Sequence, residues 1–174
     1  MSMAASHPFS EAVVVMGVAS CGKTTIGEAL AEKLNAPFIE GDRLHGEANV
    51  AKMAGGTPLT DDNRWPWLAR VGEALQGPSG KIASCSALKK SYRKAIEAAA
   101  KRPVFFIHLH GSRDVLAERI SKRKGHFMPA TLLDSQLATL EMPSADESAV
   151  TIDIDQKPKA IIDQALDFIL KAKP

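Results

Sequence analysis

The chain of 174 residues has 45% hydrophobic and 24% charged side chains and a formal net charge of +2. These values are close to the average of globular proteins and exclude intrinsic disorder, and 12 glycines and 10 prolines without a repeat exclude a collagen-like chain. Because the net charge is small, no overall field attracts nucleic acid or an anionic membrane, and we expect neither as a partner.

The sequence also carries signs of its compartment. No basic segment followed by an apolar stretch opens the chain, so we expect no signal peptide. The longest apolar run, residues 12–19, has eight residues, whereas a membrane-spanning helix needs about 20. Two cysteines, Cys21 and Cys85, are too few for a disulfide scaffold and suggest a reducing compartment. We therefore expect a cytoplasmic protein.

Short apolar runs and helical patterns alternate along the chain. In chain order they predict a strand at 13–16, a helix at 22–34, a strand from 37 to about 41, two helices within 45–76 separated at 55–58, a strand at 81–85, a helix at 88–100, a strand at 104–109, helices at 112–122 and 131–141, a strand at 150–154 and a helix at 158–170. Thr60 is the expected cap of the second helix within 45–76. The alternation predicts an α/β fold, a parallel sheet with helices on both faces, in one domain over residues 1–174.

Ligands of such sheets bind where the strands end. The predicted strand ends place on one edge Gly17, Asp42, Cys85, Ser86 and Gly111.

Residues 17–24, Gly-Val-Ala-Ser-Cys-Gly-Lys-Thr, match the phosphate-loop motif G-x-x-x-x-G-K-[ST] between a strand and a helix. The glycines let backbone N–H groups point at phosphate oxygens, and the helix start adds a positive dipole end. We expect Lys23 to bridge the β- and γ-phosphates and Thr24 to bind Mg²⁺. The alternative is a glycine-rich turn that binds nothing. The expected nucleotide-binding residues are Gly17, Ala19, Ser20, Cys21, Gly22, Lys23, Thr24 and Thr25.

A phosphate loop serves both kinases and GTPases. The N-K-x-D and D-x-x-G segments of GTPases are missing from the sequence. The loop therefore indicates a small metabolite or nucleotide kinase.

Beyond the loop, the sequence resembles the gluconokinase family over residues 12–170. The motifs that carry the resemblance are Gly41-Asp42-Arg43-Leu44-His45, Asn49, Lys52-Met53, residues 56–61, residues 64–68, residues 85–90, Tyr92-Arg93, residues 123–127, Ser135-Gln136, Leu140-Glu141, Pro143, Asp146-Glu147 and residues 153–156. The family usually has Gly-Ser where Ser20-Cys21 stand and an acidic residue where Asn63 stands; we interpret the change at Asn63 as one on the surface.

The resemblance implies ATP- and Mg²⁺-dependent phosphorylation of D-gluconate at its terminal hydroxyl, which gives 6-phospho-D-gluconate and ADP. It also implies a three-layer P-loop fold like that of shikimate kinase, with a five-stranded parallel sheet, a mobile lid and a homodimer. Through the matching motifs, Ser86, Lys89 and His126 are expected to contact the substrate.

Asp42 is the candidate for orienting the attacking hydroxyl, because a carboxylate at the strand edge could accept its proton. Two alternatives remain: Asp42 holds a Mg²⁺-bound water, or it caps a helix that starts near His45. We name Asp42 as a catalytic and a metal-site residue, together with Lys23 as catalytic and Thr24 as metal-binding.

The substrate carboxylate calls for a guanidinium, whose parallel N–H donors suit two oxygens. Arg64 and Arg93 are the candidates, against the alternative of solvated helix surface. His45 and Lys52 are seven residues apart, a spacing that would put both on one face of a helix. Both are therefore candidates for binding the hydroxyl groups of the substrate. For Trp65 and Trp67 the simpler interpretation is that they pack in the core. The alternative is that they shape the wall of the substrate pocket.

Residues 119–124 include four basic side chains. One interpretation is a solvated helix end, where positive charge suits the helix dipole. We interpret them as part of a lid over about 119–130, with substrate-binding helices over about 45–76. Arg119 and Arg123 would neutralise phosphate charge, Arg123 in a catalytic role, and Gly125 would serve as a hinge. The adenine is placed beside Arg119 and the loop that contains Gln156 and Pro158.

The two cysteines allow two interpretations. Reduced, inert thiols are the simpler one. The other is a redox pair beside the nucleotide, with the pKa of Cys21 lowered by the helix start and Lys23.

Two other functions compete with a sugar-acid kinase: another small P-loop kinase, acting on a nucleotide or a shikimate-type acceptor, and a nucleotide-binding module without turnover. The presence of Lys23, Thr24 and Asp42 argues against the second.

Overall fold

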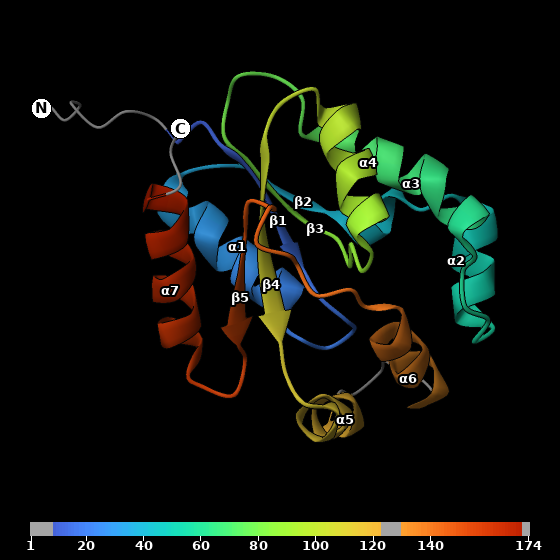
Figure 1. Ribbon diagram of the computed structural model, residues 1–174. Coiled ribbons are helices and arrows are strands. Elements are labelled where there is room, and N and C mark those ends of the chain that lie inside the picture. The colour runs from blue at the N-terminus through green and yellow to red at the C-terminus, as the bar shows by residue number, and fades with distance from the viewer. Residues whose placement is uncertain (1–8, 123–129, 172–174) are drawn as a thin grey trace, which may run out of the picture.

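The computed structural model describes residues 9–122 and 130–171, and its strands and helices follow the predicted order (Figure 1). The elements are β1 (Ala12–Met16), α1 (Lys23–Leu34), β2 (Phe38–Glu40), the 3-10 helix η2 (Gly41–Leu44), α2 (Glu47–Ala54), α3 (Asp61–Ala74), β3 (Lys81–Ser84), α4 (Lys90–Ala100), β4 (Val104–His110), α5 (Arg113–Lys122), α6 (Ala130–Thr139), β5 (Ala149–Asp153) and α7 (Pro158–Lys171).

The sheet has five parallel strands in the order β2-β3-β1-β4-β5. Helices α1 and α7 cover one face and α3 and α4 the other, while α5 and α6 lie beyond the ends to which the strand arrows point (Figure 1). The predicted three-layer α/β fold with a five-stranded parallel sheet is thus confirmed.

The central strand β1 has five residues, Ala-Val-Val-Val-Met, and all are buried. A parallel sheet with helices on both faces shields its middle strands from water on both sides, which is why their sequences are continuously apolar. On the α3–α4 side the two helices approach closely at Gly72. A Cβ at Gly72 would lie 2.5 Å from both the Cβ of Ala99 and the carbonyl oxygen of Ile96, so a larger residue there would push the helices apart.

The start of α3 bears out the expected cap. Thr60 Oγ1 accepts from the Asn63 N–H at 3.2 Å, and Asn63 Oδ1 accepts from the Thr60 N–H at 3.0 Å, which completes a capping box. Asn63 Oδ1 also accepts from Lys52 Nζ at 3.1 Å. The interpretation of Asn63 as a surface change is therefore incomplete, because its side chain closes a helix end and ties α2 to α3.

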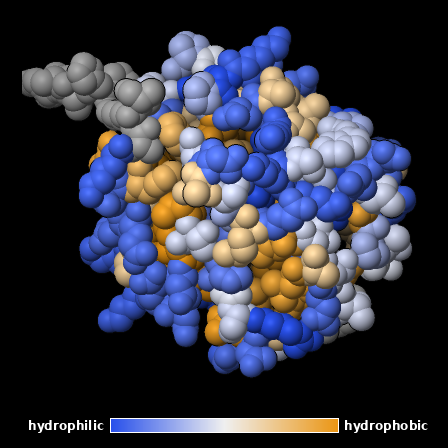
Figure 2. All heavy atoms as spheres, viewed as in Figure 1, coloured by the Kyte–Doolittle hydropathy of each residue, from blue (hydrophilic) through white to orange (hydrophobic). Residues whose placement is uncertain are grey.

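The surface in Figure 2 is mainly hydrophilic, with hydrophobic atoms showing between α7 and the sheet and between the sheet and α6. Within residues 9–122 and 130–171, no helix combines the length and the apolar character needed to cross a membrane.

Candidate active site

Two neighbouring cavities open at the edge of the sheet where the strands end. The loop pocket is lined by residues of the phosphate loop, the start of α1, η2 and α5: Ala19, Ser20, Gly22, Lys23, Thr24, Thr25, Asp42, Arg119 and Lys122. The side pocket lies between the phosphate loop, η2, α2, α3, the segment after β3 and α6. Its lining residues are Ala19, Lys23, Asp42, His45, Met53, Thr57, Pro58, Leu59, Arg64, Trp67, Ser86, Leu88, Leu132, Ser135 and Gln136. Ala19, Lys23 and Asp42 line both, so the two cavities meet at these residues.

The phosphate loop leaves β1 at Gly17, whose φ of 145° favours glycine. A Cβ there would lie 2.6 Å from Cys21 Sγ and 2.7 Å from the Leu109 carbonyl oxygen. Gly22, with φ of 100°, is the N-cap of α1. Lys23 Nζ donates to the carbonyl oxygens of Gly17 at 3.0 Å and Val18 at 2.9 Å, so the lysine lies across its own loop. The loop therefore has the wrapped shape that phosphate binding requires.

Glu40, at the end of β2, is a functional candidate that the sequence analysis missed. Its carboxylate accepts from Thr24 Oγ1 at 2.9 and 3.1 Å and from Ser84 Oγ at 2.8 Å. A carboxylate thus touches the hydroxyl that was expected to bind Mg²⁺. The sequence offered one indication of this role: Glu40 is an acidic residue two positions before Asp42, at the end of a strand that borders the site.

Asp42 lies in η2 on the wall shared by both pockets, together with Lys23. The alternative that Asp42 caps the next helix is wrong: α2 begins at Glu47, its N-cap is Gly46, and no side chain caps it. The roles in hydroxyl orientation and in holding a metal-bound water both fit this position.

His45 and Trp67 form one wall of the side pocket. Their rings stack at a centroid distance of 3.9 Å and an interplanar angle of 19°, and Trp67 Nε1 donates to the Gly41 carbonyl oxygen at 2.8 Å. Burial lowers the pKa of His45, with nearby Arg64 also lowering it and Asp42 opposing the shift. His45 therefore faces the cavity as a neutral imidazole near pH 7, suited to hydrogen bonds with hydroxyls.

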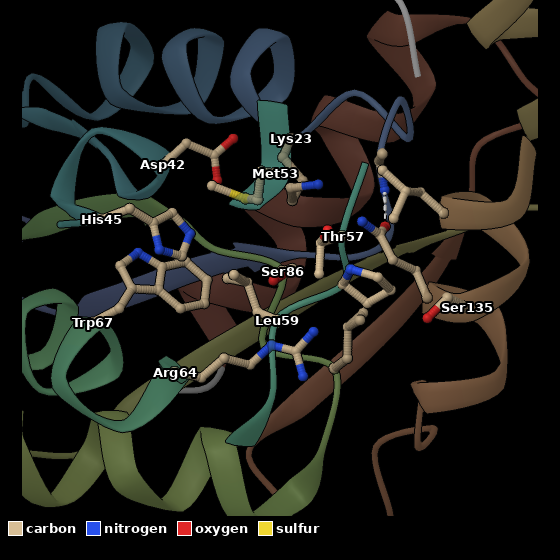
Figure 3. Close-up of a pocket in the computed structure, with 15 residues that line it drawn as sticks. Lys23, Asp42, His45, Met53, Thr57, Leu59, Arg64, Trp67, Ser86 and Ser135 are labelled. Atoms are coloured by element: carbon tan, nitrogen blue, oxygen red, sulfur yellow. Dashed lines mark hydrogen bonds between the residues drawn. The ribbon is translucent and has the colours of Figure 1, made fainter. Parts of the chain in front are cut away.

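Arg64 reaches the side pocket from α3, opposite Lys23 and Asp42 (Figure 3). Its Nη1 donates to the Tyr92 hydroxyl at 2.8 Å. Ser86 lines the same cavity at the end of β3. A guanidinium, hydroxyls and an imidazole therefore surround a small cavity, which suits a polyhydroxylated acid.

Arg93 does not reach this cavity, and its assignment to the substrate is wrong. Its side chain is 2% exposed and pairs with Glu147 through Nε at 2.6 Å and Nη2 at 3.1 Å. The remaining donors bind the carbonyl oxygens of Ala87, Leu88 and Glu141. With all its N–H groups satisfied by protein, Arg93 fixes the loop before β5 to the start of α4.

Lys52 and Lys89 are also outside the lining of the side pocket. Lys52 Nζ donates to Asn63 Oδ1, and Lys89 Nζ contacts both carboxylate oxygens of Asp61 at 3.3 Å. The structure thus does not bring these two predicted substrate residues to the cavity. Trp65, which is 38% exposed, packs edge-on against Tyr92 and does not line the pocket, whereas Trp67 is both buried and part of its wall.

Helix α6 supplies another wall of the side pocket. Gln136 Oε1 accepts a hydrogen bond from the Ala19 N–H at 2.7 Å, and Ser135 and Leu132 line the pocket beside it. Ser135 and Gln136 are among the motifs that carry the family resemblance, but neither was predicted to line the site. The helix pattern alone could not show that α6 folds over the phosphate loop.

Arg119 lies beside the phosphate loop, as expected. Its Nη2 donates to the Ile154 carbonyl oxygen at 3.0 Å, and its Nη1 lies 3.4 Å from that of Cys21. Gln156 Nε2 donates to the Asp153 carbonyl oxygen, and Pro158 begins α7; neither lines the loop pocket. Arg123, Gly125 and His126 lie outside the described residues.

Both cysteines are buried, and no disulfide joins them. Burial raises the pKa of the Cys21 thiol, although Lys23 and Arg119 oppose the shift, and it raises the pKa of Cys85 to about 12. The expected lowering at Cys21 is therefore wrong, because desolvation outweighs the neighbouring positive charges. Thiols with raised pKa values are protonated at neutral pH and are poor nucleophiles.

Comparison with known proteins agrees with this geometry. A family model described as an AAA domain matches residues 13–143. The chain is 44% identical to a gluconokinase of Gluconobacter oxydans over 158 residues, which cover 88% of each chain. It is 39% identical to the thermoresistant gluconokinase of Escherichia coli, and that match covers 92% of this chain and 94% of the relative. A crystal structure of a gluconokinase from Sinorhizobium meliloti superposes with a TM-score of 0.88 at 48% identity, covering 95% and 94% of the two chains. Shikimate kinase from Aquifex aeolicus, with a TM-score of 0.61 at 12% identity and coverage of 91% and 96%, shares the fold.

Proposed function

The chain belongs to the gluconokinase family, and from this membership we propose that it transfers the γ-phosphoryl group of ATP to the terminal hydroxyl of D-gluconate, giving 6-phospho-D-gluconate and ADP. The observation that carries the proposal is the pair of cavities that meet at Lys23 and Asp42. One is walled by the phosphate loop and the other by groups suited to a polyhydroxylated acid. A phosphoryl group bound in the first would face an acceptor bound in the second.

Phosphoryl transfer depends on positioning and on neutralising negative charge. The loop N–H groups and the start of α1 would hold the phosphates, with Lys23 moving from its carbonyl partners to phosphate oxygens and Arg119 adding charge at the rim. Asp42, on the shared wall, would orient the acceptor hydroxyl and accept its proton.

The oxygen donors near the loop fit Mg²⁺, a hard cation that prefers oxygen ligands. Thr24 would bind it through Oγ1, and the carboxylates of Glu40 and Asp42 would hold its water ligands. When bound, Mg²⁺ would offset charge on the phosphates. Within the described residues, no cluster of three or more His, Cys, Asp or Glu side chains could hold a metal alone, so the nucleotide would share the coordination.

In the side pocket, Arg64 would bind the substrate carboxylate, and His45 and Ser86 would bind hydroxyls. Arg123 and His126 remain predictions from the sequence, as does the mobile lid over about 119–130. We also retain one domain over residues 1–174, a homodimer and a cytoplasmic location as proposals that rest on the family resemblance. Light scattering on a size-exclusion column tests the dimer.

An ADP-release assay with ATP and Mg²⁺ tests the reaction across D-gluconate, related aldonic acids, shikimate and nucleoside monophosphates. We expect turnover of D-gluconate, with a product that 6-phosphogluconate dehydrogenase oxidises, and loss of turnover in Lys23→Met. Turnover of shikimate or a nucleotide instead would contradict the proposal. ATP binding without turnover of any acceptor would favour the nucleotide-binding module.

A further inference from the structure

Tyr92 lies between a carboxylate and the guanidinium of Arg64, which lines the side pocket. Its hydroxyl donates to Asp61 Oδ1 and accepts from Arg64 Nη1 at 2.8 Å. Arginine has no acceptor and an ionised carboxylate has no donor, so the single hydroxyl proton must point to Asp61. The three groups form a hydrogen-bond chain in which each donor points the same way, from Arg64 through Tyr92 to Asp61.

The surroundings of Tyr92 hold this chain in place. Tyr92 is only 1% exposed, and its ring packs against that of Trp65 in a T-shaped arrangement with a centroid distance of 5.6 Å. The Arg64 guanidinium carbon lies 5.3 Å and Lys89 Nζ 5.5 Å from the ring centroid, within the range of cation–π attraction. Lys89 also pairs with Asp61 at 3.3 Å. Burial and the bond to Asp61 raise the pKa of Tyr92, so the hydroxyl keeps its proton at neutral pH.

The hydrogen bond from Nη1 to Tyr92 restricts how the Arg64 guanidinium is turned toward the cavity. Within the described part of the protein, the Arg64 side chain donates a hydrogen bond only through Nη1, which Tyr92 occupies. Besides the second N–H of Nη1, the N–H groups of Nε and Nη2 remain as donors, and Nε and Nη2 together form one edge of the planar guanidinium. The side chain is 16% exposed and lines the side pocket. A two-oxygen anion can therefore bind this edge in bidentate fashion.

We infer that Asp61 and Tyr92 are positioning residues that orient Arg64 and thereby set the preference of the side pocket for a carboxylate-bearing acceptor. The inference rests on the proposed function and extends it from the residue that binds the carboxylate to the pair that orients it. Asp61 would also balance the charge of Arg64 before substrate arrives, since the two side chains lie 3.9 Å apart.

The primary test removes the hydroxyl and keeps the ring. In Tyr92→Phe we expect the Kd of D-gluconate, measured by calorimetry, and its KM to rise about tenfold, or about 1.4 kcal/mol. The kcat and the KM for ATP should stay within twofold. Asp61→Asn, which keeps an acceptor for Tyr92 but loses the charge, should give a smaller rise in the same direction. Asp62→Asn, an exposed neighbour in the same first turn of α3, is the matched control and should leave all constants unchanged.

A double-mutant cycle shows whether Tyr92 acts through Arg64. Once Arg64→Met has removed the guanidinium, adding Tyr92→Phe should change gluconate affinity less than twofold. A further tenfold loss in the double variant would overturn the inference, as would equal effects of Tyr92→Phe on the KM values of gluconate and ATP. If the wild type binds gluconate without phosphorylating it, the proposed reaction fails while the binding cycle still tests the positioning role. If the wild type phosphorylates gluconate and both Tyr92→Phe and Asp61→Asn bind it as tightly, the positioning role fails alone.

Discussion

The backbone N–H of Ala19 donates to the side-chain oxygen of Gln136 at 2.7 Å, across 117 positions of sequence. Because the amide oxygen must face this donor, the Gln136 NH₂ group points away from the phosphate loop. Gln136 also lines the side pocket. One amide therefore connects the nucleotide loop with the cavity in which the acceptor is expected.

If that connection aligns the two substrates, Gln136→Ala should lower kcat/KM for gluconate about tenfold, the scale of one lost hydrogen bond of about 1.4 kcal/mol. Gln136→Glu keeps an acceptor for Ala19 but places a negative charge near the phosphates, and we expect a larger loss. Steady-state kinetics check both variants, with Thr131→Ala, exposed on the same helix, as the control. Wild-type kinetics in Gln136→Ala, which removes the acceptor, would show that the contact has no part in catalysis.

Asp42 lies on the wall that both cavities share. Asp42→Asn removes the proton acceptor with little change in shape, so kcat should fall at least ~100-fold, the low end of general-base effects. The KM for ATP should hardly change. The control is Asp62→Asn, and a kcat loss below threefold would remove Asp42 from the mechanism.

Arg93 and Glu147 form a buried ion pair away from the side pocket. Arg93→Met removes the charge partner of Glu147 and the arginine donors of the Ala87, Leu88 and Glu141 carbonyl oxygens, so we expect the free energy of unfolding to fall by about 3–5 kcal/mol. Urea denaturation measures the loss. In protein that remains folded, the KM for gluconate should stay within twofold. A KM rise of tenfold or more without loss of stability would restore Arg93 to the substrate site.

His108 is 1% exposed on β4, and its pKa is lowered to about 4, first by burial and then by His110, Arg93 and Lys23. The unfolded chain, with an ordinary pKa near 6.5, therefore binds this proton before the folded protein does. The stability that depends on a neutral His108 is complete above pH 6.5 and is lost as the pH falls toward 4, by about 3 kcal/mol in total.

Urea denaturation at several pH values between 7 and 4 measures this loss. His108→Leu should flatten the pH dependence in that interval, whatever its effect at pH 7. The exposed variant Lys159→Met is a suitable control because it lies far along the chain on α7 and does not contact His108. An unchanged slope in His108→Leu would assign the acid sensitivity to other groups.

Patterns within one element or one motif were enough to predict the parallel sheet, the phosphate loop and the place of Asp42. They depend on apolar runs and on the rule that strand ends meet at one edge. The choice of partner by long polar side chains was not predictable in this way. Arg93 sits in the right helix but binds Glu147, 54 positions later, and Lys89 turns to Asp61. Glu40 and Gln136 were missed because their roles appear only once β2 and α6 have been brought beside the phosphate loop.

Lys23 rests on the carbonyl oxygens of Gly17 and Val18. The rotational freedom of its long side chain has therefore already been given up when the protein folds. An incoming nucleotide exchanges these two neutral acceptors for charged ones and need not immobilise a mobile ammonium group, so less entropy is lost on binding. The same arrangement keeps the ammonium group hydrogen-bonded between catalytic cycles, when nothing anionic lies in the loop.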